Sequence, residues 1–437
     1  MSLTSRLKGK AIAAWLGPTG DVARRAAGAL RRRGTATTRL DLYFDVADAW
    51  SYLAAQIAQR LVDAYGVDLT VTAVTPPAAD VASFPQLRTK LAVRDCQLLV
   101  DYYDLAFPGT KEADSGMVRD VGSVLIRQRP PREQLQCALE LADAMWRIDR
   151  KALTLLLGKW GQDAHGSVAP ILNAAYAELR AAGHYQGGML RYGDAWYGVD
   201  RISHLEDAIA RDLGVPAKHV IHERPLADRG ALPLGGKGEP QLEMWFSFRS
   251  PYSYLALHQI EAVLAPSSLP LVLRPVLPMV QRGVQLPAVK RTYLMLDAKR
   301  EAERLGLPFG EICDPLGAGI DHCLAIAAWA AARSPADALA FAKSATRGIW
   351  AEAADVASYV DLRAVVERAQ LPWDDAKHAI GDLEAARKQA AVNATDMAVY
   401  GLWGVPSFRV GDVVAWGQDR LPMIADRLRR ARDIAKT

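Results

Sequence analysis

The chain has few cysteines and no cysteine pair. Its 437 residues include four, Cys96, Cys137, Cys313 and Cys323, and none belongs to a Cys-x-x-Cys motif. This pattern excludes a zinc-ribbon site and a dithiol redox centre of the usual spacing. A chain of this length needs no disulfides to hold a core, so buried structural thiols are expected. The eight histidines also lack ligand spacing, and we predict no metal site.

Long apolar runs and a strong charge bias are missing as well. No run reaches about 18 apolar residues, so the sequence predicts no membrane span. The net charge is +4, which gives no reason to expect a nucleic-acid partner. Half of the residues are hydrophobic and 23% are charged, as in soluble globular proteins. We therefore expect a cytoplasmic protein of two or three domains.

Acidic residues are nearly absent from the first 39 residues. Asp21 stands there against nine lysines and arginines. We interpret residues 1–39 as a basic extension, either helical or poorly ordered. A segment that binds acidic surfaces or lipid is the alternative, and a targeting sequence is the less favoured one.

The strongest organisational feature is an internal repeat. "LDLYFDVADAWSYLAAQ" from Leu40 matches "LEMWFSFRSPYSYLALH" from Leu242, at an offset of 202 residues. "GHYQGGMLRYGDAWYGVDR" from Gly183 likewise matches "GLWGVPSFRVGDVVAWGQDR" from Gly401. Two matches in the same order predict a duplicated domain. We place the copies at 40–214 and 241–437, joined by a linker at 215–240 that is rich in glycine and proline, and the copies could pair as a pseudo-dimer.

Each copy has the same predicted order of elements. In the second copy, residues 241–248 alternate as a strand does, 251–265 have helical periodicity, and 269–278 form a second strand. Residues 287–395 are almost entirely helical in pattern. A hairpin around Gly411-Asp412 and a last helix follow. This order predicts an α/β fold of two tandem thioredoxin-like domains, each β-α-β, an all-helical insertion, then β-β-α.

Four motifs of the second copy have a familiar combination. "FRSPYSYLA", "KRTYL…RLGLPF", "GVPSF" and "WGQDRL" resemble the 2-hydroxychromene-2-carboxylate isomerases. They are also similar to the kappa-class glutathione transferases and, more distantly, to DsbA-like oxidoreductases. The resemblance covers essentially all of the second copy. The first copy resembles the family weakly, through "FDVADAWSYLA" and "YGVDR".

The resemblance makes Ser250 the candidate catalytic residue. In the family this serine faces the sulfur of bound glutathione, where a hydroxyl and a helix N-terminus together stabilise a thiolate. Ser250 and Ser253 stand where the redox relatives have their cysteines, so a disulfide cannot form there. The structural alternative is that Ser250 is an N-cap, followed by Pro251 at the first helical position.

The resemblance also implies a glutathione-binding set. Val405-Pro406 would form a cis-proline loop that pairs with the glutathione backbone. Gln418 and Asp419 would hold the γ-glutamyl end, although Asp419 could simply cap a helix. Lys290 could meet the glycyl carboxylate or an acidic substrate, or lie on a solvated helix face. Tyr252, Arg274 and Trp403 are weaker candidates for the substrate pocket, and each could be packing. Val284 stands where the family often has asparagine, which leaves part of this contact open.

The first copy departs from the pattern at its site. Asp48 replaces Ser250, and Gly187-Gly188 replaces Val405-Pro406. A carboxylate would repel a thiolate and raise the pKa of a thiol. We interpret this copy as structural or regulatory, and the alternative is a changed chemistry with Asp48 as a base.

These features lead to one main hypothesis. The second copy is expected to be an enzyme, a glutathione-dependent isomerase that acts by thiolate addition to a small unsaturated aromatic-derived acid. A kappa-type transferase and a non-catalytic tandem binding protein are the alternatives. A DsbA-like disulfide oxidoreductase is disfavoured by the missing cysteines. The sequence leaves open the substrate and the oligomeric state.

Overall fold

The computed structural model describes residues 3–17, 20, 22–23, 39–235, 240–265, 267 and 269–434. The chain divides into two compact units. The N-terminal unit comprises Arg25–Arg229 with Leu286–Lys290, and the C-terminal unit comprises Met1–Arg24, Gly230–Gln285 and Arg291–Thr437. In the described part of the chain, no helix combines the length and apolar character that crossing a membrane requires.

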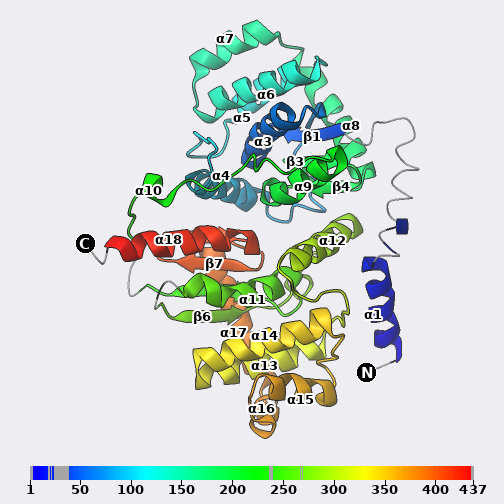
Figure 1. Ribbon diagram of the computed structural model, residues 1–437, viewed down its shortest axis with the longest axis vertical. Helices are drawn as coiled ribbons and strands as arrows, with labels where there is room; N and C mark the ends of the chain where they lie inside the picture. The colour runs from blue at the N-terminus through cyan, green and yellow to red at the C-terminus, as the bar shows by residue number, and fades with distance from the viewer. Residues whose placement is uncertain are drawn as a thin grey trace. The chain divides into compact units, whose positions relative to one another are not determined.

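The N-terminal unit has four strands, and its helices are concentrated between the second and third (Figure 1). Its elements are β1 (Arg39–Asp45), α3 (Ala49–Tyr65), β2 (Asp68–Val74), α4 (Pro85–Tyr102), α5 (Ser115–Leu125), α6 (Pro131–Trp146), α7 (Arg150–Trp160), η1 (His165–Ser167), α8 (Val168–Ala181), β3 (Met189–Tyr192), β4 (Ala195–Tyr197), η2 (Val199–Arg201), α9 (Ile202–Leu213) and α10 (Leu226–Arg229).

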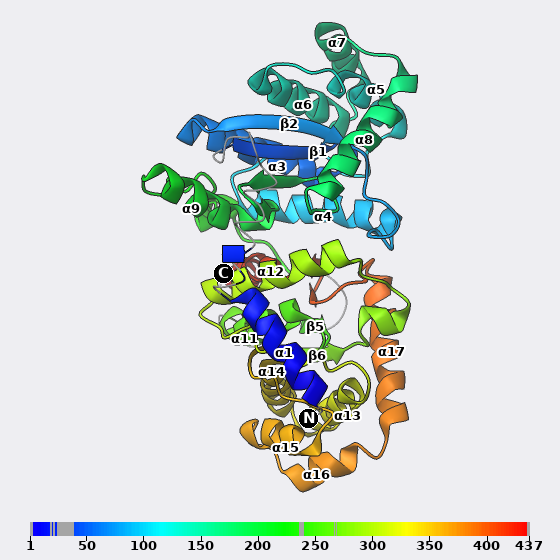
Figure 2. The same ribbon diagram turned by 90° about the vertical axis from the view of Figure 1, so that its right-hand side faces the viewer.

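The C-terminal unit repeats this order after α1 (Leu3–Leu16). Its elements are β5 (Leu242–Phe246), α11 (Pro251–Leu264), β6 (Leu271–Pro275), η3 (Met279–Arg282), α12 (Ala288–Arg304), α13 (Ala318–Arg333), α14 (Pro335–Ala351), α15 (Tyr359–Arg368), α16 (Trp373–Ala379), α17 (Leu383–Val399), β7 (Ser407–Val410), β8 (Val413–Trp416), η4 (Gln418–Arg420) and α18 (Leu421–Ile434). Figure 2 shows α15 and α16 at the end of this unit that lies farthest from its sheet.

The two sheets have the same order and the same strand directions. They run β2-β1-β3-β4 and β6-β5-β7-β8. β1 pairs in parallel with β2, and β5 with β6, because a helix returns the chain between them. The last two strands of each sheet are antiparallel. The predicted fold class is confirmed: each unit is β-α-β, a helical insertion, then β-β-α.

The C-terminal core forms where the sheet meets α11. All five residues of β5 are buried, since helices or strands cover both faces of a central strand. Tyr254, Leu255, Leu257 and Ile260 of α11 are also fully buried. This apolar stripe along α11 holds the helix on the sheet and thereby determines where its first turn lies.

The predicted hairpin is present. β7 and β8 pair around Gly411, whose φ is +58°, a conformation that glycine adopts without a steric penalty. A Cβ at Gly411 would lie 2.4 Å from the carbonyl oxygen of Gly235, so both conformation and space favour glycine here. The turn ends β7, which begins directly after the Val405-Pro406 bond.

Part of the N-terminal extension and part of the expected linker pack with the two units. α1 of the basic extension belongs to the C-terminal unit, where Leu16 is buried and Gly9 closely approaches the carbonyl oxygen of Ile312. The basic residues from Arg24 to Arg33 lie outside the described residues. Residues 215–229 of the expected linker group with the N-terminal unit, where the Arg224 amide donates to the Tyr102 carbonyl.

Truncating the buried stripe of α11 should destabilise the C-terminal unit. We expect Ile260→Ala to lower the free energy of unfolding by about 2–5 kcal/mol, because it opens a cavity in a closed core. Denaturant unfolding of the full chain, followed by tryptophan fluorescence, measures the change. Val392→Ala on the exposed part of α17 is the control, with an expected change within about 0.5 kcal/mol. Equal effects of the two substitutions would contradict this assignment of the core.

Candidate functional site

Ser250 lies at the junction of β5 and α11. Its backbone is extended, with φ −112° and ψ 117°, and Pro251 takes the first helical position. The Ser250 hydroxyl accepts a hydrogen bond from the Ser253 amide at 3.2 Å. Ser250 is therefore the N-cap of α11, as one of the two interpretations predicts. Its side chain is 9% exposed, which leaves the hydroxyl at the border of the interior.

The 403–407 segment lies against this cap. The Val405-Pro406 peptide bond is cis, which confirms the prediction. The Ser250 hydroxyl donates to the Val405 carbonyl at a long 3.3 Å, and the Gly417 amide donates to the Pro406 carbonyl at 2.9 Å. The fold thus brings together three segments that are far apart in sequence: the start of α11, the proline loop and the start of η4.

Tryptophan rings flank the proline loop. Trp403 and Trp416 lie with ring centroids 5.0 Å apart. Gly404 between Trp403 and the cis bond has no room for a side chain, since a Cβ would lie 2.6 Å from the Trp416 indole nitrogen. The Trp403 carbonyl accepts from the Arg282 guanidinium at 3.1 Å. This placement keeps Trp403 as a candidate wall of the site.

Tyr252 is held by a buried carboxylate. Its hydroxyl donates to Asp297 of α12 at 2.7 Å, and Asp297 is 1% exposed. The bond orients the half-buried tyrosine two residues after the cap. Arg249, just before the cap, forms a two-point ion pair with Asp314, with both contacts at 2.7 Å. Tyr252 and Arg249, on either side of the cap, are therefore each held by an aspartate. Asp297 lies on α12, and Asp314 lies in the loop that follows it.

The structure corrects the expected role of Gln418. Its side chain is 1% exposed. The Gln418 amide oxygen accepts from Gln259 of α11 at 2.8 Å, and its nitrogen donates to Glu301 of α12 at 2.8 Å and to Asp419. Both ends of the amide are used inside the protein, so a direct contact with glutathione is not available to it. Asp419 is half-buried on the same 3-10 turn.

Arg274 also has a different place from the one expected. It lies on β6, where its guanidinium donates to Glu243 of β5 at 2.8 Å and lies over the Trp245 ring. Arg409 of β7 pairs with the other oxygen of Glu243 at 2.8 Å. Since Glu243 is 3% exposed, the two arginines neutralise a buried carboxylate on the sheet. These contacts agree with the interpretation of Arg274 as a packing residue.

Lys290 groups with the N-terminal unit. Its ammonium donates to the Val81 carbonyl at 3.0 Å and lies 5.4 Å from the centre of the Tyr185 ring. Burial, with a further effect of the Arg88 charge, lowers the pKa of Lys290 to about 8. These contacts place Lys290 among residues of the N-terminal unit. Val284 is buried, and its amide donates to the Met279 carbonyl.

The N-terminal unit builds the corresponding junction with carboxylates. Asp48 caps α3 by accepting from the Ser51 amide at 3.0 Å. Asp48 and Asp45 are 2% and 1% exposed, and Arg88 of α4 lies 3.0 Å from Asp48. A Cβ on Gly188 would lie 2.7 Å from the Asp48 carboxylate. Position 188 therefore has no room for a side chain beside this cap.

Burial changes the ionisation of these two acids. It raises the pKa of Asp45 to about 7, with a second contribution from the Asp48 charge, while Arg88 opposes the shift. Burial likewise raises the pKa of Asp48, and Arg88 and Ser51 oppose it. Two buried carboxyl groups beside a single arginine therefore tend to retain a proton near neutral pH.

The repeat offset of 202 residues identifies partners that the sequence analysis missed. In the N-terminal unit, the Trp50 indole nitrogen donates to Asp95 at 2.7 Å, as Tyr252 does to Asp297 at the same offset. Arg88 stands at the position that corresponds to Lys290. Extending the repeat alignment from the first helix into the next one would have found both. Glu301 and Gln259 belong to none of the sequence motifs. Their role as partners of Gln418 is visible only in the fold.

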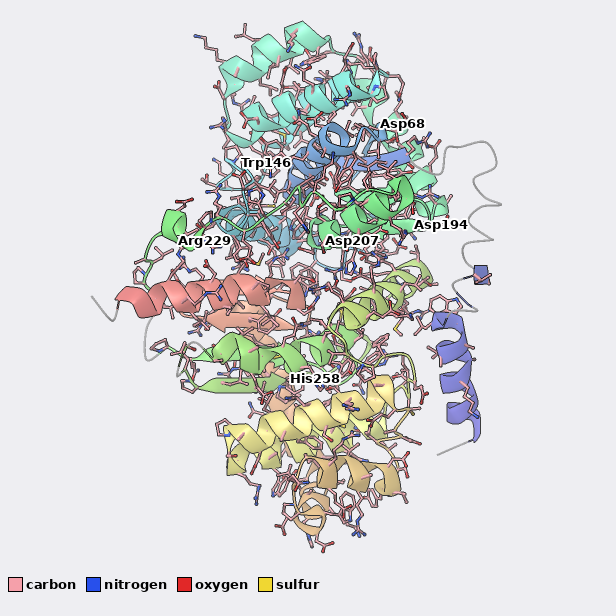
Figure 3. All side chains as sticks on the ribbon, viewed as in Figure 1. Asp68, Trp146, Asp194, Asp207, Arg229 and His258 are labelled. Atoms are coloured by element: carbon pink, nitrogen blue, oxygen red, sulfur yellow. The ribbon has the colours of Figure 1, made fainter. Side chains whose placement is uncertain are left out.

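Other chemically capable residues lie in structural surroundings. None of the four cysteines forms a disulfide, all four are buried, and burial raises the pKa of Cys313 to about 11. His258 on α11 is half-buried (Figure 3), and burial and the Lys343 charge lower its pKa to about 4. It is neutral at pH 7, as a structural histidine would be. Within the described residues, no cluster of His, Cys, Asp and Glu suits a metal ion.

Comparison with known proteins supports this arrangement. The family model described as the DSBA-like thioredoxin domain matches residues 241–429. These residues form a DsbA-like thioredoxin domain. No curated protein matches the chain.

Several solved structures are similar to this chain. A 2-hydroxychromene-2-carboxylate isomerase is 22% identical, with a TM-score of 0.39, and the match covers 45% of this chain and 98% of that one. A probable DsbA oxidoreductase from Streptomyces coelicolor is 16% identical over 45% and 91% of the two chains, with a TM-score of 0.35. The cytosolic disulfide reductase DsbM from Pseudomonas aeruginosa is 18% identical over 45% and 97%, also with a TM-score of 0.35. Values this low say nothing about a shared reaction.

The DsbA-like domain has hydroxyl groups and no thiols at the start of α11. Two hydroxyl groups, Ser250 and Ser253, replace a pair of cysteines at the start of α11. A hydroxyl cannot take part in thiol–disulfide exchange. At a helix N-terminus it can donate a hydrogen bond to an anion, and the helix dipole adds to that attraction.

The buried acid pair of the N-terminal unit should make stability depend on pH. Because the folded state raises the pKa of Asp45, the folded state binds a proton that the unfolded state has lost above about pH 4. The melting temperature should therefore fall as pH rises from about 5 to about 7, and this contribution should level off above about pH 8. Thermal unfolding of the full chain across pH 5–9 measures it.

Asp45→Asn should flatten that dependence and raise the melting temperature at pH 8, since asparagine still accepts from the Ala47 amide. Asp80→Asn is the control. Asp80 is exposed, and its hydrogen bond with Arg180 lowers its pKa. Its contribution to the pH dependence of stability therefore lies below this pH range. An unchanged pH profile in Asp45→Asn would contradict a shared buried proton.

Proposed function

We propose that the C-terminal domain is a glutathione-dependent isomerase of the 2-hydroxychromene-2-carboxylate isomerase type. The observation that supports it is the Ser250 hydroxyl, which caps α11 and faces the cis Val405-Pro406 loop. The site then combines the N-terminus of α11, the Ser250 hydroxyl as a donor, and the extended backbone at Val405. This combination suits a peptide thiolate better than any other ligand that the site residues suggest.

The Ser250 hydroxyl can serve a bound thiolate without disturbing the cap. Its oxygen accepts from the Ser253 amide, while its proton is held only by the 3.3 Å bond to Val405. A hydroxyl proton rotates to the best acceptor, and a thiolate is a stronger acceptor than a carbonyl at this distance. Ser250 would thus stabilise the anion and favour ionisation of the thiol near neutral pH.

The remaining parts of the ligand have candidate partners in the same three segments. Val405 precedes the cis bond, so its backbone groups can pair with an extended peptide in the manner of an added strand. Asp419, half-buried at the start of η4, is a suitable partner for an ammonium group. Trp403 and Tyr252 supply aromatic surface beside the cap for a planar substrate.

When bound, glutathione would supply a thiolate that adds reversibly to a conjugated double bond, permits rotation about the resulting single bond and leaves by elimination. The protein's part is to hold the anion at Ser250 and to position the conjugated acid beside it. The thiolate leaves with the electron pair with which it arrived, so no oxidant or reductant is needed. The N-terminal unit has no counterpart to this arrangement, because Asp48, paired with Arg88, stands in place of Ser250 and Gly187-Gly188 in place of Val405-Pro406.

Ser250→Ala tests the proposal directly. We expect the wild type to bind reduced glutathione in calorimetry and to lower its thiol pKa below about 8.5. Loss of a hydrogen bond to an anion should raise the pKa of the bound thiol by about one unit and reduce isomerase activity by about tenfold or more. Thiolate absorbance during a pH titration and an assay with 2-hydroxychromene-2-carboxylate measure these effects.

Ser334→Ala is a matched control within the same unit. Ser334 caps α14, accepts from the Asp337 amide at 3.0 Å and is followed by Pro335, so it repeats the Ser-Pro helix start away from the proline loop. Both substitutions should cost about 1 kcal/mol of stability by loss of a cap. Only Ser250→Ala should change the thiol pKa. Failure of the wild type to bind glutathione, or equal thiol pKa values in all three proteins, would refute the proposal.

A further inference from the structure

An arginine stands directly before the serine cap of α11. The Arg249 side chain is 29% exposed, and its guanidinium donates to both oxygens of Asp314, from Nε and from Nη2, at 2.7 Å each. These two bonds use one edge of the planar group. Among the described residues no hydrogen bond reaches Nη1, so the second edge, formed by Nη1 and Nη2, has no partner there.

The loop that carries Asp314 is attached to the end of the strand before the cap. The Cys313 amide donates to the Ile349 carbonyl on α14 at 3.0 Å. The next residue of that helix, Trp350, donates from its indole nitrogen to the Phe248 carbonyl at 3.1 Å, one residue before the arginine. Both members of the ion pair are thus fixed to the same helix. The direction of the guanidinium is therefore set by the fold and not by a mobile surface contact.

We infer that Arg249 is a specificity-determining residue, whose second guanidinium edge binds the carboxylate of the substrate while Ser250 holds the thiolate. The inference rests on the proposed function, and it deepens it by assigning the residue that selects an acid. A carboxylate meets such an edge through two parallel N–H···O bonds. Because Asp314 already orients the guanidinium, less side-chain freedom is lost when the acid binds. Asp314 also offsets part of the charge, so the edge selects by geometry as well as by attraction.

The position of Arg249 in the chain suits this role. Consecutive Cα atoms are about 3.8 Å apart, so the arginine side chain begins beside the Ser250 cap. In a small conjugated acid the reactive double bond and the carboxylate are only a few bonds apart. An acid whose double bond lies at the Ser250 hydroxyl therefore has its carboxylate within reach of the long side chain on the neighbouring residue.

The two copies of the repeat differ at both positions together. At the offset of 202 residues, Ala47 corresponds to Arg249, and Asp48 corresponds to Ser250. The N-terminal unit thus has neither the guanidinium nor the serine hydroxyl at its helix start. The two groups occur in the same copy, as expected if they serve one ligand.

The experiment compares an acid with its neutral ester on the full chain. The substrates are 2-hydroxychromene-2-carboxylate and its methyl ester, each assayed with reduced glutathione in excess. Arg249→Gln removes the charge and the planar fork, and Arg249→Lys keeps the charge alone. Arg333→Gln is the matched control. Arg333 also precedes a Ser-Pro helix start, but it binds Asp337 of that same helix at 2.9 Å.

We expect kcat/KM of the wild type and of Arg333→Gln to be about tenfold or more higher for the acid than for the ester. Arg249→Gln should lose about tenfold or more for the acid, chiefly through KM, and less than about twofold for the ester. Arg249→Lys should keep an intermediate preference, since an ammonium group lacks the planar fork. The affinity for glutathione and its bound thiol pKa should be unchanged in both Arg249 variants, unlike in Ser250→Ala.

Each contrary result has its own meaning. Equal losses for acid and ester in Arg249→Gln would show a structural role and overturn the inference, as would an unchanged preference. A lower affinity for glutathione in this variant would assign the edge to a carboxylate of glutathione and overturn it too. A wild type that isomerises acid and ester equally would overturn the inference and leave the thiolate site intact. A wild type that binds no glutathione, or isomerises neither compound, would refute the proposed function and this inference with it.

Discussion

The free amides in the first turn of α11 are the constraint on which the rest of the site depends. A helix cannot satisfy these groups from within, and here the turn lies at the border of a packed interior. A side-chain oxygen must meet them, and Ser250 supplies it. Because the apolar stripe of α11 holds the helix against β5, that oxygen is placed beside the proline loop. A requirement of folding thus produces a hydroxyl at the positive end of a helix.

The N-terminal unit meets the same constraint in a different way, with different consequences. Asp48 satisfies the amides of α3, but its charge must then be compensated in the interior, and Arg88 provides this. The supporting structure is nevertheless shared, since Trp50 binds Asp95 as Tyr252 binds Asp297. The two units therefore have a common scaffold around the cap and differ in the group that the cap presents. This difference, and not the fold, separates their chemical capacities.

Burial decides which of the expected binding residues can meet a ligand. Gln418 and Arg274 belong to motifs that favour binding, yet both serve buried carboxylates, Glu301 and Glu243. A buried acid requires neutralising partners more strongly than a surface site requires a ligand. The sequence cannot reveal this competition, because it does not show which side chains the fold buries beside these acids. Ser250, at 9% exposure, and the half-buried Val405 and Asp419 are less completely enclosed than Gln418.

Short-range patterns in the sequence were sufficient to predict the strands and helices around the site. Alternation predicted β5, Ser-Pro predicted the start of α11, and Gly411-Asp412 predicted the hairpin, since each depends on neighbouring residues alone. The repeat predicted two units with one order of elements, and the family motif predicted the cis bond at Pro406. The tertiary structure alone decided the partners of Gln418, Arg274 and Lys290, and the enclosure of Asp48 by Gly188. Those outcomes depend on which polar groups the fold removes from water together, and these groups lie from 31 to 209 positions apart in the sequence.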